Sequence, residues 1–223
     1  MKLRQLLAAV GLLTALPLPR PDTDSAAFAG STVFFPLVGL LVGVALVALR
    51  WCAGQQWPPW LVAVALVVVW EGLSATARRT DPSPRHVPVG FAGVAFCLVA
   101  KAACLAQQGG GQVAALLFAP LLGRWAMVVL AVGARDAGAP ARKFNPAITF
   151  REFALTSVFS CAVVLLTAEA FGVLLIACVA ALCLVLRWLF QRLGGVSWPR
   201  LVSGAQLTEL LVLLLFSLLA HHN

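Results

Sequence analysis

Residues 33–49, VFFPLVGLLVGVALVAL, form an unbroken apolar run that decides the class of fold. The run carries no charged side chain and falls within the ~17–25 residues that a transmembrane helix needs. Over the whole chain of 223 residues, 61% are hydrophobic and 11% are charged. A soluble domain is about half apolar and a quarter charged. Because so few polar side chains are available to cover a water-facing surface, the composition predicts a protein embedded in lipid.

Similar runs recur along the rest of the chain and predict a helical bundle. Further spans are expected at 60–77, 90–107, 113–133, 153–168, 170–190 and 205–220. Lipid admits only helices or closed barrels, and these runs lack the alternating pattern of barrel strands. We therefore predict an all-α, polytopic integral membrane bundle of six to seven transmembrane helices. The fifth and sixth runs are candidates for a tight helical hairpin around Glu169.

The first 19 residues, MKLRQLLAAVGLLTALPLP, contain an apolar stretch of about 11 residues, too short to span a bilayer as a helix. We predict an uncleaved helix at the membrane interface, ended by Pro17 and Pro19. A cleaved secretory signal is the alternative. The chain is then a single membrane domain over 1–223, with this helix and a lead-in loop in 1–32 and the bundle in 33–220.

The distribution of basic residues predicts the orientation in the membrane. If 1–32 faces one side and the spans alternate, that side receives 13 of the 16 Lys and Arg residues, and the other receives Arg50 alone. Positive residues accumulate on the cytoplasmic side. The N-terminus and the connections 78–89, 134–152 and 191–204 are therefore expected in the cytoplasm. This bias also explains the net charge of +8, and no basic stretch interleaves with aromatics, so nucleic-acid binding is not expected.

Four charged residues fall at membrane depth, namely Glu71, Lys101, Arg124 and Glu209. A charge at the centre of a span costs ~3 kcal/mol on insertion scales, so it is usually paired or faces a wet cavity. One interpretation is that two acids and two bases neutralise one another and hold the bundle together. The other is a polar cavity in which a cation attracts a phosphate. The candidate phosphate-binding residues are Arg124, Lys101, Arg78, Arg79 and Arg85.

Four segments, in order along the chain, resemble the adenosylcobinamide-GDP ribazoletransferase (cobalamin synthase) family. They are LLAAVGLLTALPLP (6–19), STVFFPLVGLLVG (31–43), APLLGRWAMVVL (119–130) and RLGGVSWPRLVSGAQLTELLVLL (192–214). In the first segment, Ala15 stands where the family has an arginine. Each match alone is weak, and the ordered set is fairly specific.

The resemblance implies an enzyme of the bacterial inner membrane that requires magnesium. It implies that the cobinamide-phosphate part of adenosylcobinamide-GDP is transferred onto α-ribazole or its 5′-phosphate, with release of GMP. Other cobalamin-assembly enzymes are then candidate partners, besides the bilayer. In such transfers a metal ion neutralises the charge on the phosphoryl oxygens, and Mg²⁺ prefers hard oxygen ligands.

Most of the acids that the resemblance assigns to the metal are replaced in this chain. In WEGLSATARRTDPSPRH (70–86), the first family acid falls on Glu71, but the second and third fall on Ala75 and Arg78. In the closing motif, one family glutamate falls on Gln206 and only Glu209 is retained. Glu71 is the candidate catalytic residue. The candidate metal ligands are Glu71, Asp81 and Glu209.

Three interpretations of function remain at this point. The first is a ribazoletransferase with an atypical site, slower than a family member that retains all the acids. The second is a catalytically silent relative that binds corrinoid or partner enzymes at the membrane. The third is a small transporter, for which charges at membrane depth and helix-breaking Gly and Pro are typical.

Overall fold

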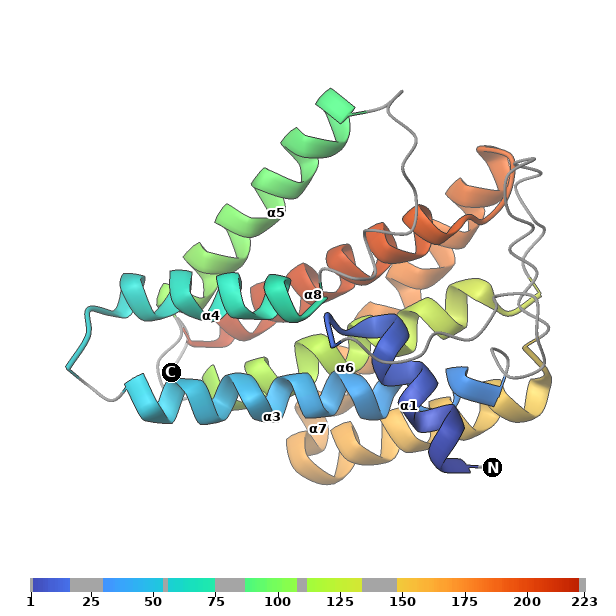
Figure 1. Cartoon of the computed structure of the whole chain (residues 1–223), viewed down its shortest axis with the longest axis horizontal. Helices are drawn as coiled ribbons and strands as arrows, with labels where there is room; N and C mark the ends of the chain where they lie inside the picture. The colour runs from blue at the N-terminus through green and yellow to red at the C-terminus, as the bar shows by residue number, and fades with distance from the viewer. Residues whose placement is uncertain are drawn as a thin grey trace.

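The computed structural model describes residues 2–16, 30–53, 56–74, 87–107, 112–133 and 148–220, and these are almost entirely helical (Figure 1). The helices are α1 (Lys2–Leu13), α3 (Phe35–Ala53), α4 (Pro59–Ser74), α5 (Val87–Gln107), α6 (Gln112–Ala131), α7 (Phe150–Arg192) and α8 (Trp198–Ala220). The predicted all-α bundle is confirmed, and each predicted span lies on a helix over most of its described residues.

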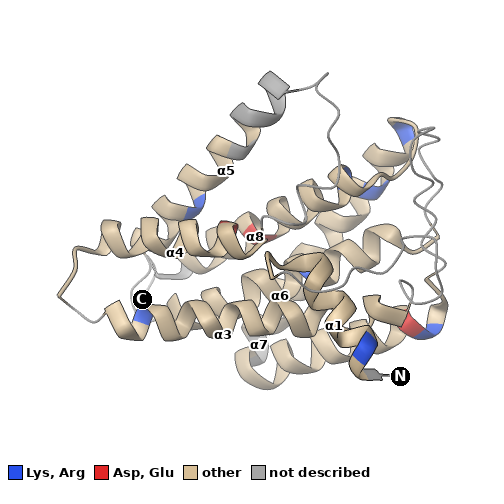
Figure 2. Cartoon of the chain, in the orientation of Figure 1, with Lys and Arg blue, Asp and Glu red and all other residues tan. Residues whose placement is uncertain are grey.

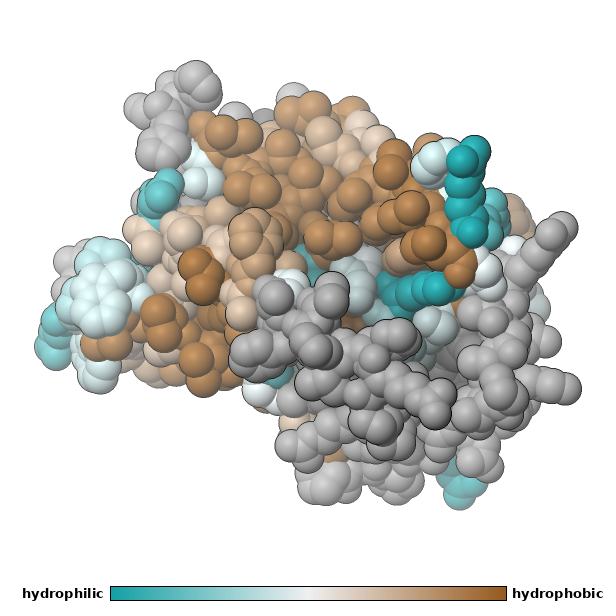
Figure 3. Space-filling model, turned by 90° about the horizontal axis from the view of Figure 1, so that it is seen from above, coloured by the Kyte–Doolittle hydropathy of each residue, from teal (hydrophilic) through white to brown (hydrophobic). Residues whose placement is uncertain are grey.

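Within the described residues, five helices are long and apolar enough to cross a membrane. They are Gly30–Ala53, Gln112–Ala131, Phe150–Ala168, Phe171–Arg192 and Trp198–Leu218. The expected span at 60–77 is shorter as an apolar helix, Pro59–Ser74, whereas α5, at the expected span 90–107, has 21 residues. The 16 residues of α4 rise about 24 Å, less than the ~30 Å of a bilayer core. The chain is a multi-pass membrane protein, and hydrophobic residues predominate among those that Figure 3 colours on the face it shows, as lipid contact requires.

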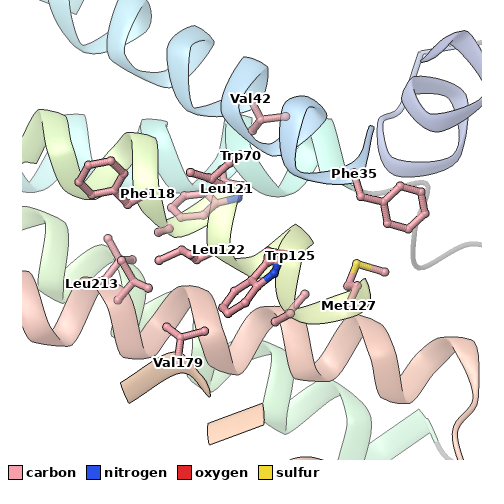
Figure 4. Close-up of a cluster of buried hydrophobic side chains, with 14 of the residues drawn as sticks. Phe35, Val42, Trp70, Phe118, Leu121, Leu122, Trp125, Met127, Val179 and Leu213 are labelled. Carbon is pink, nitrogen blue, oxygen red and sulfur yellow. The ribbon is translucent and has the colours of Figure 1, made fainter. Parts of the chain in front are cut away.

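Helix α6 forms the centre of the bundle and packs against α3, α7 and α8. Within its apolar stretch 78% of the residues are buried. In the two limbs of α7, Phe150–Ala168 and Phe171–Arg192, the buried shares are 17% and 28%. Figure 4 shows Leu121, Leu122 and Trp125 of α6 among side chains that neighbouring helices contribute. The limbs of α7 instead expose large apolar side chains such as Leu166, which indicates that they face lipid.

Two glycines allow α3 to approach α6 closely. A Cβ atom on Gly39 would lie 2.3 Å from the carbonyl oxygen of Pro120, and one on Gly43 would lie 2.8 Å from that of Leu116. Pro120 has no N–H, so the Leu116 carbonyl loses its usual partner within the helix and faces α3. Close packing through small residues is a main source of helix association in lipid. The contact between α3 and α6 is therefore set by backbone surfaces.

Helix α7 doubles back on itself, as the sequence predicted for the fifth and sixth spans. A Cβ atom on Gly172 would lie 2.9 Å from the carbonyl oxygen of Val164, although residues eight apart are about 12 Å apart along a straight helix. The ribbon in Figure 1 shows the turn. On the returning limb, Phe171 makes an edge contact with Phe216 of α8, with ring centroids 4.9 Å apart.

Helix α1 packs on α3 and ends earlier than the sequence predicted. The expected stop was at Pro17, whereas the last helical residue is Leu13. The reason is a tertiary hydrogen bond: the Ala15 N–H donates to the Leu73 carbonyl oxygen at 2.8 Å instead of continuing the helix. The start of the chain is thereby attached to the end of α4.

Candidate functional site

Lys101 of α5 lies at the meeting point of α4, α5 and α8 and binds three side-chain oxygens. Its Nζ lies 2.9 Å from Glu71 Oε1, 2.7 Å from Gln206 Oε1 and 2.5 Å from Glu209 Oε2. Lys101 and Glu209 are fully buried, and Glu71 is 8% exposed. An ammonium group has three N–H donors, so all of them are engaged. We call these four residues the Lys101 cluster.

Helical spacing explains how the cluster forms. Gln206 and Glu209 are three residues apart on α8 and therefore share one face. Glu71 lies one turn before the end of α4, so its carboxylate can meet that face. Gln206 Nε2 also donates to Glu71 Oε2 at 3.5 Å. Trp70 covers the cluster, with its ring centroid 4.5 Å from the Lys101 ammonium, a distance typical of a cation–π contact.

Helix α6 makes room for Glu209 at Gly123. A Cβ atom on Gly123 would lie 2.7 Å from Glu209 Cγ and 3.0 Å from Glu209 Oε1. Among the described residues, Glu209 Oε1 has no hydrogen-bond partner, and neither does the buried Trp70 Nε1. Because a buried polar atom without a partner costs free energy, these two atoms destabilise the cluster unless another group pairs with them.

Arg124 directly follows Gly123 on α6 and is 1% exposed. Its Nη2 donates to Ser74 Oγ at 2.8 Å, and its Nη1 lies 3.8 Å from Met127 Sδ. Its Nε has no hydrogen-bond partner within the part of the chain that the structure describes. Ser74 is the last residue of α4, so Arg124 is anchored where the connection to α5 begins. It retains an unused donor at that point.

The structure brings together three of the residues that the sequence singled out. The predicted pairing of charges at membrane depth is confirmed for Lys101 with Glu71 and Glu209, whereas the contacts of Arg124 are to Ser74 and Met127. Figure 2 shows a basic segment on α5 and an acidic one beside α8 within the bundle, while most of the helical ribbon is uncharged. The candidates Arg78, Arg79, Arg85 and Asp81 lie outside the described residues, and their roles stay predictions.

Sequence reasoning did not assign Gln206, Trp70, Ser74 or Gly123 to the site. A signal was available for two of them. Gln206 precedes Glu209 by three residues, and Ser74 follows Glu71 by three, so each shares a helix face with a charged residue. Trp70 and Gly123 belong to residue types that are common in membrane helices, and nothing in their spacing marks them.

The described residues show no ready-made cluster of metal ligands. Among them, no three His, Cys, Asp or Glu side chains lie close enough together to hold a metal ion. Mg²⁺ requires near-octahedral oxygen ligands at ~2.0–2.1 Å. Glu71 and Glu209 converge on the Lys101 ammonium instead. The role of Asp81 as a metal ligand stays a prediction.

An apolar helical exterior around a buried charged centre defines a class: a multi-pass membrane protein with a polar site inside its bundle. The particular family follows from comparison with known proteins. Residues 5–76 and 84–217 match the family described as cobalamin-5-phosphate synthase. The chain belongs to this family.

Curated relatives agree with this assignment. The chain is 32% identical over 238 residues to an adenosylcobinamide-GDP ribazoletransferase of Roseiflexus sp. (strain RS-1), covering 95% of this chain and 88% of the relative. It is 30% identical over 239 residues to the protein of the same name in Pseudomonas fluorescens (strain SBW25), covering 92% and 96%. No solved structure matches the chain.

Proposed function

We propose that this chain is an adenosylcobinamide-GDP ribazoletransferase. It joins adenosylcobinamide-GDP to α-ribazole or its 5′-phosphate and releases GMP, in the last stage of cobalamin biosynthesis. The observation that carries the proposal is the family match over 5–76 and 84–217, which includes all or nearly all of each helix that builds the site. The transporter interpretation has no comparable support.

The reaction places specific demands on the site. A hydroxyl group of α-ribazole attacks the phosphorus of the cobinamide phosphate, and the bond from that phosphorus to the oxygen bridging to GMP breaks. The hydroxyl loses its proton, and GMP leaves as an anion. Negative charge therefore increases on the phosphoryl oxygens, and donors fixed beforehand at those oxygens lower the barrier.

Arg124 is the described residue that best meets this demand. Ser74 fixes its guanidinium through Nη2 at 2.8 Å, and Nε remains free of hydrogen bonds to the described residues. A guanidinium anchored on one nitrogen can donate from its other nitrogens to a phosphoryl oxygen. We infer that Arg124 binds the pyrophosphate of adenosylcobinamide-GDP beside the end of α4. The arginines at 78, 79 and 85 belong to the connection that begins there and are proposed to contribute further positive charge.

Glu71 and Lys101 are proposed to act at the same end of α4. Glu71 occupies the position of the first family acid and is the proposed catalytic carboxylate, one helical turn from Ser74. Lys101 has all three donors engaged, so a substrate phosphate would have to displace one of its partners before binding to it. Its proposed role in this reaction is therefore to position Glu71.

We propose the inner membrane as the location, with the N-terminus and the connections 78–89, 134–152 and 191–204 in the cytoplasm. The basic-residue bias of 13 to 1 supports this orientation. Soluble adenosylcobinamide-GDP and α-ribazole would then reach the site from the cytoplasm. Other cobalamin-assembly enzymes are proposed partners on that side.

The test is a transfer assay with purified protein in lipid nanodiscs. Adenosylcobinamide-GDP and α-ribazole are supplied together and separately, and GMP and the corrinoid product are separated by chromatography. We expect both products only with both substrates, at a rate below that of a family member that retains all the acids. Corrinoid binding without GMP release would support a silent relative, and absence of both would refute the proposal.

A further inference from the structure

The Lys101 cluster contains one more negative charge than positive charge. Glu71 and Glu209 contribute two carboxylates and Lys101 one ammonium, and they come from three different helices. Two buried carboxylates that face each other across a small space repel strongly in a medium of low dielectric constant. A cation between them offsets this repulsion.

The cation present at that point is the Lys101 ammonium. Both carboxylates contact the same nitrogen, at 2.9 Å and 2.5 Å, and Gln206 Oε1 completes its shell at 2.7 Å. A divalent ion bound to the same two carboxylates would have to lie close to Nζ. The repulsion between the two cations would then oppose binding, since neither is screened by water there.

We propose that Lys101 is the resident cation of this site, and that its ammonium holds Glu71 and Glu209 together in place of a divalent metal ion. The two carboxylates then bind no Mg²⁺ in the native protein. The inference concerns cation binding alone and goes beyond the proposed transferase activity. Its test uses no corrinoid, so its failure is distinguishable from failure of the transferase proposal.

A corollary is that removing the ammonium should create a divalent site. In Lys101→Met, two carboxylates and the Gln206 carbonyl oxygen remain around the vacated position, and a divalent ion would balance their charge. Mn²⁺ shares the preference of Mg²⁺ for oxygen ligands and is detected directly by electron paramagnetic resonance. The readout therefore does not depend on activity.

The experiment measures Mn²⁺ bound per chain for the wild type, Glu71→Gln, Glu209→Gln, Lys101→Met and the double variant Lys101→Met/Glu71→Gln. Arg192→Met, which removes an exposed cation stacked on Trp188, is the matched control. We expect the wild type, both glutamine variants and the control to bind equally. Lys101→Met should gain one Mn²⁺, and the double variant should lose it.

Thermal unfolding provides the second measurement. Mn²⁺ should raise the melting temperature of Lys101→Met and leave that of the double variant unchanged. Loss of wild-type Mn²⁺ binding on Glu71→Gln or Glu209→Gln would overturn the proposal, as would a folded Lys101→Met that gains no Mn²⁺. If Lys101→Met does not fold, the comparison of the wild type with the two glutamine variants decides by itself.

Discussion

Glu209 of α8 crosses directly over Gly123 of α6, and this contact holds its carboxylate against Lys101. The Cγ atom of Glu209 would lie 2.7 Å from a Cβ atom at position 123, and Glu209 Oε2 lies 2.5 Å from Lys101 Nζ. A methyl group added at residue 123 would therefore disturb the charged centre that α4, α5 and α8 form.

Gly123→Ala should destabilise the protein by about 1–3 kcal/mol, because the added methyl group overpacks the interior and displaces Glu209 from Lys101. The measurement is thermal unfolding in detergent micelles. The matched control is Gly93→Ala, since no heavy atom lies within 4 Å of a Cβ atom at that position on α5. Equal melting temperatures for the two variants would contradict the packing described for Glu209.

Lys101→Met should destabilise the protein far more than Glu71→Gln. Removing the lysine leaves two buried carboxylates without a cation, and breaking a buried ion pair in this way costs ~3–5 kcal/mol. Removing the Glu71 charge leaves Lys101 paired with Glu209 at 2.5 Å, a cluster without net charge. The check is the free energy of unfolding of both variants, measured with a chelator present. A larger loss for Glu71→Gln would show that the ammonium is not the element that holds the cluster.

Gly39→Ala should separate α3 from α6. The new methyl group would lie 2.3 Å from the Pro120 carbonyl oxygen, and a backbone atom cannot move aside as a side chain can. In lipid, the bundle depends on such close approaches. We expect a lower melting temperature than for Gly72→Ala, whose Cβ atom would meet nothing within 4 Å. A Gly39→Ala protein as stable as Gly72→Ala would argue against the α3–α6 contact.

Membrane topology can be measured with fusions. A reporter placed after residue 88 should be cytoplasmic and one after residue 110 should lie on the opposite side, because α5 separates them and the 78–89 connection is basic. We expect a reporter that works only in the periplasm to be active when fused after residue 110 and inactive when fused after residue 88. The reverse pattern would overturn the proposed orientation, and with it the route of the substrates.

The positions of the helices could be predicted because lipid imposes one strong constraint, an apolar run of sufficient length. Their ends could not, because local hydrogen bonds set them. Helix α7 begins at Phe150, where the Thr149 N–H donates to Glu152 Oε2 at 2.6 Å in a capping box that hydropathy does not detect. Helix α8 begins at Trp198, with Pro199 in its first turn, well before the apolar run that marked it.

The charged residues of the site could be predicted because charges at membrane depth are rare. Which of the two basic residues pairs with the acids could not be predicted. Both Lys101 and Arg124 were available, and the choice depends on how α5 crosses α4 and α8. Gln206 and Gly123 complete the site through their place on a helix face. Neither is a residue type unusual enough to be picked out from the sequence in advance.

The most direct measurement compares the wild type with Arg124→Gln in the transfer assay. Loss of one fixed donor at a site of developing negative charge costs ~10²–10³ in rate, so we expect GMP release to fall by about 100-fold in Arg124→Gln while Arg192→Gln retains the wild-type rate. Thermal unfolding of each variant verifies that it is folded. Equal rates in wild type and Arg124→Gln, or no corrinoid product from the wild type, would contradict the assignment of this site.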